Sequence, residues 1–513
     1  MIKNFKWLLL VSLSFVACNS NDDDSAPAEV PITPGSASFT KYVALGDSFA
    51  AGYSDGALFK KAQETSYVNI LAQQFMPVGG TAITTPFMVD NIGGFSNGGV
   101  QVPQFATRLY FDAATKAPIN VTGVSGTPIT AHLPGQFSNM GVPGAKSYHL
   151  IAPGYGNLAG VFASPATASP YFSRFSSSPT TTILADALAQ SPTFFSLFIG
   201  GNDVLGFATS GGDGSDPITP TTTFDYAYNT LVTSLTANGA KGVVGNLPYI
   251  TTLPHFTTVP YNPLTAKTLG LGNIEAGNAA IAELNLKLYD PLKKALSFFN
   301  AGERINLLLP TPTIPGSIDV PNPLLISDES LPNLSAQLTA AFTPSLGAQK
   351  AAIYGQIFGQ ARQATKADLV LLSTKSVIAG PTGYPAPLDK FGVTFPLLDK
   401  HILVPSEIEE VKVATDAYNV TIATIAEAKG LAFVDTKTAM AQLASTGVRF
   451  GNYHLTASYA TGGAFSLDGV HPTPRGYAFI ANLFIDAINA KFGSTLRTVD
   501  LANYQTLFPE TIQ

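Results

Sequence analysis

The chain has 513 residues, of which 45% are hydrophobic and 10% aromatic, enough for one large domain with insertions or two to three smaller ones. Only 12% of the residues are charged, the net charge is −6, and no basic run follows the N-terminus. A nucleic-acid partner is therefore not expected, because contacts to phosphate backbones require clustered Lys and Arg.

The N-terminus has the pattern of a secretory signal. Lys3 and Lys6 precede the apolar run "WLLLVSLSFVA", which is too short to cross a bilayer as a helix and ends at Cys18. We predict a signal peptide over residues 1–17. "FVAC" resembles a bacterial lipobox, although Phe15 replaces the usual aliphatic residue. The resemblance implies that Cys18 is lipidated and anchors the protein to a membrane of the cell envelope, with the outer membrane, periplasmic or surface-exposed, as the expected place.

Residues 18–39 are rich in Ser, Pro and Asp and lack periodicity, which predicts a flexible tether. The run Asp22 to Asp24 either resembles an acidic export signal of surface lipoproteins or simply adds solubility. Because Cys18 is the only cysteine, disulfides and Cys-ligated metals are excluded from the folded part.

The first predicted strand, Tyr42 to Leu45, runs into Gly46, Asp47 and Ser48 and then into small residues. An ordinary strand-to-helix turn explains this stretch, since turns prefer Gly, Asp and Ser. The alternative is that Ser48 is a nucleophile whose small neighbours leave its hydroxyl accessible.

Further continuous apolar runs predict strands that are covered on both faces. They are "TFFSLFIGGND" (193–203), "KGVVGNLP" (241–248), "ADLVLLST" (367–374) and "GLAFVDTK" (430–437). Helical patterns alternate with them: 224–235 before Gly239, 406–425 before Gly430 with a capping box of Ser406 and Glu409, and 474–492 before Gly493. The alternation predicts an α/β fold with a mainly parallel sheet.

Two segments interrupt this alternation. Residues 89–132 contain the strand-like pieces "TRLYFDA" and "INVTGV", and residues 262–400 are Pro-rich. We interpret both as insertions in a domain that covers 40–513. The larger one is expected to form a lid or subdomain over the site, and both are expected to wall the substrate pocket.

Polar residues at strand ends indicate where a site lies. In open α/β sheets, ligands bind at the carboxyl ends of the strands, so Ser48 and Asn202 are expected side by side. In "LDGVHPTPRGY", Asp468 precedes His471 by three residues in a loop that opens a helix. Such a loop can hold the carboxylate against Nδ1 and leave Nε2 free to act as a general base.

Acyl transfer also needs donors for a developing oxyanion. "GGND" supplies the carboxamide of Asn202, "NMGVPGA" the backbone N–H of Gly141, and the amide of Ser48 is a third donor.

These four blocks, in this chain order, resemble the SGNH hydrolases, also called the GDSL lipase/esterase family. The resemblance covers about 41–260 and 400–492 and implies a three-layer flavodoxin-like α/β fold. It implies a catalytic triad of Ser48 as nucleophile, His471 as base and Asp468 as its orienting group, and an oxyanion hole of Ser48, Gly141 and Asn202. Asp47 is expected to stabilise the turn only.

Competing motifs are weaker. "GFSNG" (94–98) fits a G-x-S-x-G nucleophile elbow, but no strand precedes Ser96 and no helix follows it, so we interpret it as a loop. Asp213 and Asp216 could bind Ca²⁺, but we interpret their stretch as a plain surface loop, and no H-E-x-x-H motif is present. We expect neither a metal nor a cofactor in the catalytic site.

The sequence thus predicts a serine hydrolase that cleaves carboxylic esters, carried by a small molecule or a polymer. The alternatives are a carbohydrate acetylesterase and a non-catalytic glycan- or lipid-binding lipoprotein on a hydrolase scaffold.

Overall fold

The computed structural model describes residues 31–314 and 316–512. The predicted signal peptide, residues 1–17, and Cys18 lie outside the described residues. Within the described part of the chain, no helix is long and apolar enough to cross a membrane.

A five-stranded, all-parallel sheet forms the centre of a mixed α/β fold. Its strands in chain order are β1 (Tyr42–Gly46), β6 (Asn139–Gly141), β7 (Phe194–Phe198), β8 (Lys241–Gly245) and β13 (Ala432–Val434). Numbered 1 to 5 along the chain, they lie across the sheet in the order 2-1-3-4-5. The order reverses between β1 and β7, which makes that crevice the topological switch point.

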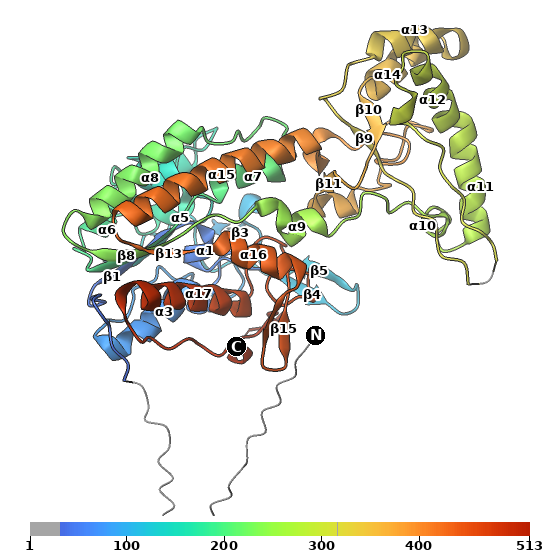
Figure 1. Cartoon of the computed structure of the whole chain (residues 1–513). Coiled ribbons are helices and arrows are strands. Elements are labelled where there is room, and N and C mark those ends of the chain that lie inside the picture. The colour runs from blue at the N-terminus through green and yellow to red at the C-terminus, as the bar shows by residue number, and fades with distance from the viewer. Residues whose placement is uncertain (1–30, 315, 513) are drawn as a thin grey trace, which may run out of the picture.

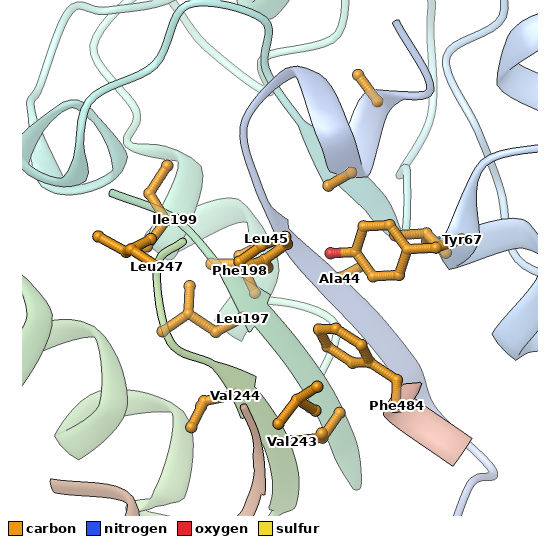
Figure 2. Close-up of a cluster of buried hydrophobic side chains, with 14 of the residues drawn as sticks. Ala44, Leu45, Tyr67, Leu197, Phe198, Ile199, Val243, Val244, Leu247 and Phe484 are labelled. Atoms are coloured by element: carbon orange, nitrogen blue, oxygen red, sulfur yellow. The ribbon is translucent and has the colours of Figure 1, made fainter. Parts of the chain in front are cut away.

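Helices cover both faces of the sheet, as the unbroken apolar strands require (Figure 1). On one side lie α8 (Thr221–Thr236) and α15 (Pro405–Ala428), and on the other α3 (Tyr67–Phe75) and α17 (Pro474–Phe492). Figure 2 shows how Phe484 of α17 and Tyr67 of α3 pack beside strand residues such as Phe198 and Val243. All these side chains are fully or almost fully buried.

Shorter helices connect the layers. They are α1 (Ser48–Ala51), α2 (Lys60–Glu64), α4 (Leu158–Val161), α5 (Pro170–Ser173), α6 (Ile183–Leu188), α7 (Asn202–Thr209), α9 (Pro254–Thr257) and α16 (Thr436–Ser445). A hairpin of β14 (Val448–Phe450) and β15 (Tyr453–Leu455) precedes the last loop.

Residues 89–132 form two small antiparallel hairpins rather than part of the central sheet. These are β2 (Ser96–Asn97) with β3 (Val100–Gln101), and β4 (Leu109–Asp112) with β5 (Ala117–Asn120). The predicted insertion therefore contains strands where the two strand-like pieces were noted, with β5 beginning two residues before the second piece.

The larger insertion forms a lobe beside the sheet domain (Figure 1). It has its own hydrophobic clusters, built from residues between Val259 and Val404. Its elements are α10 (Ala266–Leu269), α11 (Ile274–Leu284), α12 (Asp290–Ser297), α13 (Ser335–Leu346), α14 (Ala348–Phe358), β9 (Leu325–Ser327), β10 (Ala361–Gln363), β11 (Leu369–Val370) and β12 (Ile402–Leu403).

Four of the five predicted strands lie in the central sheet, and one prediction was wrong. "ADLVLLST" provides β11, which pairs with β12 in an antiparallel ladder and buries Val370 in the lobe. The fifth strand of the sheet is instead β6, at the start of the stretch "NMGVPGA", which we interpreted as a loop. The three residues of β6 are poor strand formers, and they are extended because they pair with β1.

Two predicted boundaries also differ. Helix α15 begins at Pro405 rather than with a Ser406–Glu409 capping box, and Glu407 accepts the N–H of Val404 at 2.8 Å. Residues 31–39, which the sequence assigns to the tether, instead pack on the sheet domain. Ser36 N–H donates to Phe492 O at 2.8 Å, and the ring of Phe39 is buried and stacks on Phe75 with centroids 4.2 Å apart.

Candidate active site

Ser48 lies at the carboxyl end of β1, as the first residue of α1. Asp47 caps this helix by accepting the Phe49 N–H at 2.9 Å, so its predicted turn-stabilising role is confirmed. Gly46 permits the close approach of β7, since a Cβ there would lie 2.6 Å from Phe198 O. Burial raises the pKa of Asp47 to about 6. The result is a tight, rigid turn that presents the Ser48 hydroxyl.

His471 reaches this hydroxyl from the other end of the chain. Its Nε2 lies 2.9 Å from Ser48 Oγ, and its Nδ1 lies 2.8 Å from Asp468 Oδ2. Thr473, two residues after His471, caps α17 by accepting the Gly476 N–H at 3.0 Å, so the helix begins at Pro474 and fixes the loop end. The three residues predicted as a triad are therefore in mutual hydrogen-bond contact.

Asp468 is held ionised by its surroundings. The backbone N–H groups of Val470 and His471 donate to Oδ1 at 2.8 Å each, and that of Gly56 donates to Oδ2 at 2.9 Å. Burial alone would raise the pKa of Asp468, but the adjacent His471 and these donors outweigh it and hold the pKa well below its usual range. A charged Asp468 stabilises the Nδ1–H tautomer of His471, which leaves Nε2 free to accept a proton.

Five hydrogen bonds join residues 53–56 to residues 466–477, and we call this set of contacts the clasp. They are Ser54 Oγ to Pro472 O (3.0 Å), Asp55 N to Ser466 Oγ (2.9 Å), Gly56 N to Asp468 Oδ2 (2.9 Å), Leu467 N to Asp55 Oδ1 (2.9 Å) and Tyr477 Oη to Tyr53 O (2.6 Å). The clasp fixes the His471 loop against the segment that follows Ser48.

Aromatic rings complete the support of the imidazole. Tyr53 and Phe49 lie against His471 with ring centroids 4.5 and 5.7 Å away. Behind the loop, the backbone N–H of His255 donates to Gly469 O at 2.9 Å. These supporting roles could not be predicted from the sequence, since Tyr53 and His255 belong to no motif.

Asn202 begins α7, directly after β7, as predicted. Its Nδ2 donates to Ala145 O at 3.0 Å, which leaves its second N–H free. Its neighbour Gly201 lies against the Ser48 turn, since a Cβ there would be 3.7 Å from Asp47 Oδ2. The two strand ends at the switch point thus meet, as expected from the sheet.

Gly141 does not have the predicted role. Its N–H donates to Asn139 Oδ1 at 3.0 Å and is not free to bind an oxyanion. A Cβ at this position would lie 2.3 Å from Ala51 N, so Gly141 allows close packing of β6 on α1. In the same loop Gly144 is exposed, has a φ of +77°, and its N–H has no acceptor among the described residues. The N–H of Gly144 is therefore available to a ligand, which that of Gly141 is not.

An apolar pocket adjoins the Ser48 turn. Its volume is about 100 Å³, and its wall includes Ser48 and Asn202. The rest of the wall is almost entirely apolar and comes from α7, from 247–253, from α16 and from α17, with Leu205, Leu253, Met440, Leu443, Ile480 and Leu483 among its residues. The prediction that the two insertions wall the pocket was wrong, because no residue of 89–132 or 262–400 lines it.

The competing sequence motifs have other roles. Ser96 is buried in the β2–β3 hairpin, and its N–H donates to Thr127 O at 2.9 Å, so "GFSNG" is a turn rather than a nucleophile elbow. Asp216 forms an ion pair with Lys146 at 2.6 Å. Asp213 accepts the Ser215 N–H at 2.9 Å, so each of the two carboxylates has a partner of its own.

Comparison of the chain with protein-family models, with curated proteins and with solved structures gave no match.

The clasp leads to a prediction for Asp55. Burial, and next to it the charge of Asp468, raises the pKa of Asp55 to about 7, although the Leu467 N–H opposes this rise. Folding therefore favours the neutral carboxyl, and ionising it costs folding free energy between about pH 4 and pH 7. In Asp55→Asn, which cannot ionise, the free energy of unfolding should rise relative to wild type over this range, by a few kcal/mol at about 1.4 kcal/mol per pKa unit.

Urea unfolding at several pH values measures this difference, which should level off above about pH 7. Asp500→Asn, at an exposed carboxylate, is the matched control and should show no such trend. A pH-independent difference for Asp55→Asn would contradict the assignment.

Proposed function

We propose that the protein is a serine hydrolase that cleaves carboxylic esters. The proposal depends on one observation: Ser48 Oγ, His471 and Asp468 form a continuous hydrogen-bonded chain, with heavy-atom separations of 2.9 and 2.8 Å. This arrangement activates a serine hydroxyl, which alone is a poor nucleophile at neutral pH.

The proposed fold class is the three-layer flavodoxin-like fold of the SGNH hydrolases. The strand order 2-1-3-4-5, with helices on both faces, supports it. The positions of Ser48, just after the end of β1, and of Asn202, just after the end of β7, support it too. Lipidation of Cys18, and with it anchoring in the outer membrane, remains part of the proposal from the sequence alone.

The proposed reaction has two halves. Ser48 Oγ attacks the acyl carbon while its proton moves to His471 Nε2, and the oxyanion is stabilised by the N–H groups of Ser48 and Gly144 and by Asn202 Nδ2. Collapse of this intermediate expels the alcohol, which takes the proton from His471. Water, deprotonated by the same imidazole, then attacks the acyl-enzyme, releases the carboxylic acid and restores Ser48. Asp468 stays charged throughout, and no cofactor enters.

The apolar pocket favours an ester with a hydrocarbon acyl chain over a short acetyl group. An acetyl group has one methyl carbon beyond its carbonyl and would leave most of the pocket empty. Each methylene group that enters an apolar pocket gains about 0.8 kcal/mol. The acetylesterase alternative therefore makes less use of the observed walls than an esterase or lipase does.

Replacing the nucleophile tests the proposal directly. Ser48→Ala should lower kcat by several orders of magnitude while leaving the midpoint of thermal unfolding nearly unchanged. A fluorophosphonate probe should label the wild type and fail to label Ser48→Ala, with Ser96→Ala as a control that remains labelled. Equal labelling of wild type and Ser48→Ala would exclude the mechanism, and a folded wild type that neither reacts nor turns over would favour the binding-protein alternative.

Asn202→Ala tests the oxyanion hole. Loss of one preorganised donor should lower kcat by about 10²–10³-fold with a smaller change in KM. Because the substitution also removes the bond to Ala145 O, the thermal midpoint must be measured beside the kinetics. A decrease in kcat of less than tenfold would show that Asn202 is not a donor in the transition state.

Chain-length kinetics test the role of the pocket. We expect kcat/KM on p-nitrophenyl esters to increase at least about tenfold from acetate to octanoate, because each added methylene group enters the apolar pocket. Ala439→Phe, which places a large ring in the α16 wall, should reduce the rate on octanoate and spare acetate. Ala441→Phe, exposed on the same helix, is the matched control. Highest activity on acetate, or on acetylated xylan, would instead favour the acetylesterase.

A further inference from the structure

Three carboxylates meet where the lobe joins the sheet domain. Glu329 follows β9, Asp399 lies in the turn Asp399–His401 at the end of the lobe, and Glu407 lies in the first turn of α15. One carboxylate oxygen of each lies within 4.8 Å of those of the other two. Such a concentration of negative charge needs a compensating partner.

Glu407 carries the second observation. The residue is only 4% exposed, and its Oε2 accepts the N–H of Val404 and so caps α15. The other oxygen, Oε1, is buried and has no hydrogen-bond donor among the described residues. Helix capping accounts for one oxygen only, and a buried acceptor without a partner is costly, so Oε1 indicates a missing ligand.

The surrounding backbone is shaped to admit this oxygen. Gly212 has a φ of +74°, and a Cβ on it would lie 2.1 Å from Glu407 Oε1. Beside it, a Cβ on Gly211 would lie 2.1 Å from Asp399 O. The loop after α7 therefore packs directly on the cluster and covers it on one side, while Glu329 is exposed to solvent on the other.

Nearby cations do not neutralise the cluster. The guanidinium of Arg362 is bound to Asp328 and Asp368, at 2.5 Å each, and among the described ion pairs none joins Lys400 to the three carboxylates. The carboxylate of Asp213 adds further negative charge beside Asp399.

We propose that Glu329, Asp399 and Glu407 bind a divalent cation, Ca²⁺, which links the lobe to the sheet domain. The donors are all oxygen atoms, which hard cations prefer. Two oxygens that each lie about 2.3–2.6 Å from one Ca²⁺ can be at most about 5 Å apart, and the observed spacing satisfies this limit. Ca²⁺ tolerates irregular geometry and completes its shell with water, for which the Glu329 side is open.

The ion would link Glu329 to the segment 399–407, through which the chain returns from the lobe to the sheet domain. Glu329 and Asp399 belong to the lobe, whereas α15 packs against α8 and α7 of the sheet domain. Ca²⁺ that binds only the folded arrangement stabilises it by mass action. The proposal does not depend on the hydrolase reaction, so Ser48→Ala should keep the same response to Ca²⁺.

Thermal unfolding of the full chain tests the site. After treatment with EDTA and dialysis, millimolar Ca²⁺ should raise the midpoint of wild type by at least about 3 °C, and isothermal titration with CaCl₂ should give one ion per chain. Glu407→Gln keeps an acceptor for the Val404 N–H and removes the charge, so it should lose the response. Glu409→Gln, exposed on the same helix, should keep it.

Glu329→Gln provides a second test if Glu407→Gln does not fold, because Glu329 is exposed and its substitution leaves the helix cap intact. It should weaken Ca²⁺ binding at least tenfold in the titration. No rise in the wild-type midpoint, or an equal rise in wild type and in both ligand variants, would overturn the proposal and leave a shared proton as the compensating partner. An equal rise with Mg²⁺ would overturn the choice of Ca²⁺.

Discussion

The whole site depends on the clasp between residues 53–56 and 466–477. Ser48 and His471 are separated by 423 positions, and their contact has to be maintained by something other than chain connectivity. Each clasp bond contributes about 1 kcal/mol, and the five together fix the position of the loop. Asp468 belongs to both systems, since the Gly56 N–H that anchors the loop also stabilises the carboxylate that orients His471. Asp468 therefore both anchors the loop and orients His471.

The parallel sheet supplies the second requirement, which is a place where loops converge. Strands β1 and β7 pair in register from Tyr42 to Gly46, so their carboxyl ends stop at one level. Because the strand order reverses there, the connections after β1 and β7 leave toward opposite faces and open a crevice. Ser48, the proposed nucleophile, and Asn202 begin the two helices on either side of it. Helix starts also expose backbone N–H groups, which suits the proposed oxyanion hole.

The sequence predicted the candidate site residues that lie in local motifs. It could not predict contacts between residues that are distant in the chain. Ser48, Asp468 and His471 could be identified from the sequence because each lies beside turn residues at a strand end or a helix start. Gly141 was assigned a donor role because its loop looked free of side chains, but the Asn139 carboxamide that occupies its N–H is seen only in three dimensions. The clasp was invisible for the same reason. Likewise, an apolar run in residues 367–374 predicts a buried strand but cannot say which core buries it.

The lobe shows how a large insertion can be carried without disturbing the site. The chain leaves the sheet domain after α9 and returns through α15, and the lobe buries its apolar residues in clusters of its own. Helix α15 packs on α7, whose first residue is Asn202, so the return point of the lobe lies one short helix away from the proposed oxyanion hole. A freely swinging lobe would pull on that helix. Glu407 lies at the opposite end of α7, and fixing the junction there would hold the lobe still and keep Asn202 in place. This role would explain why a carboxylate is buried at a position where an apolar residue would cost less free energy.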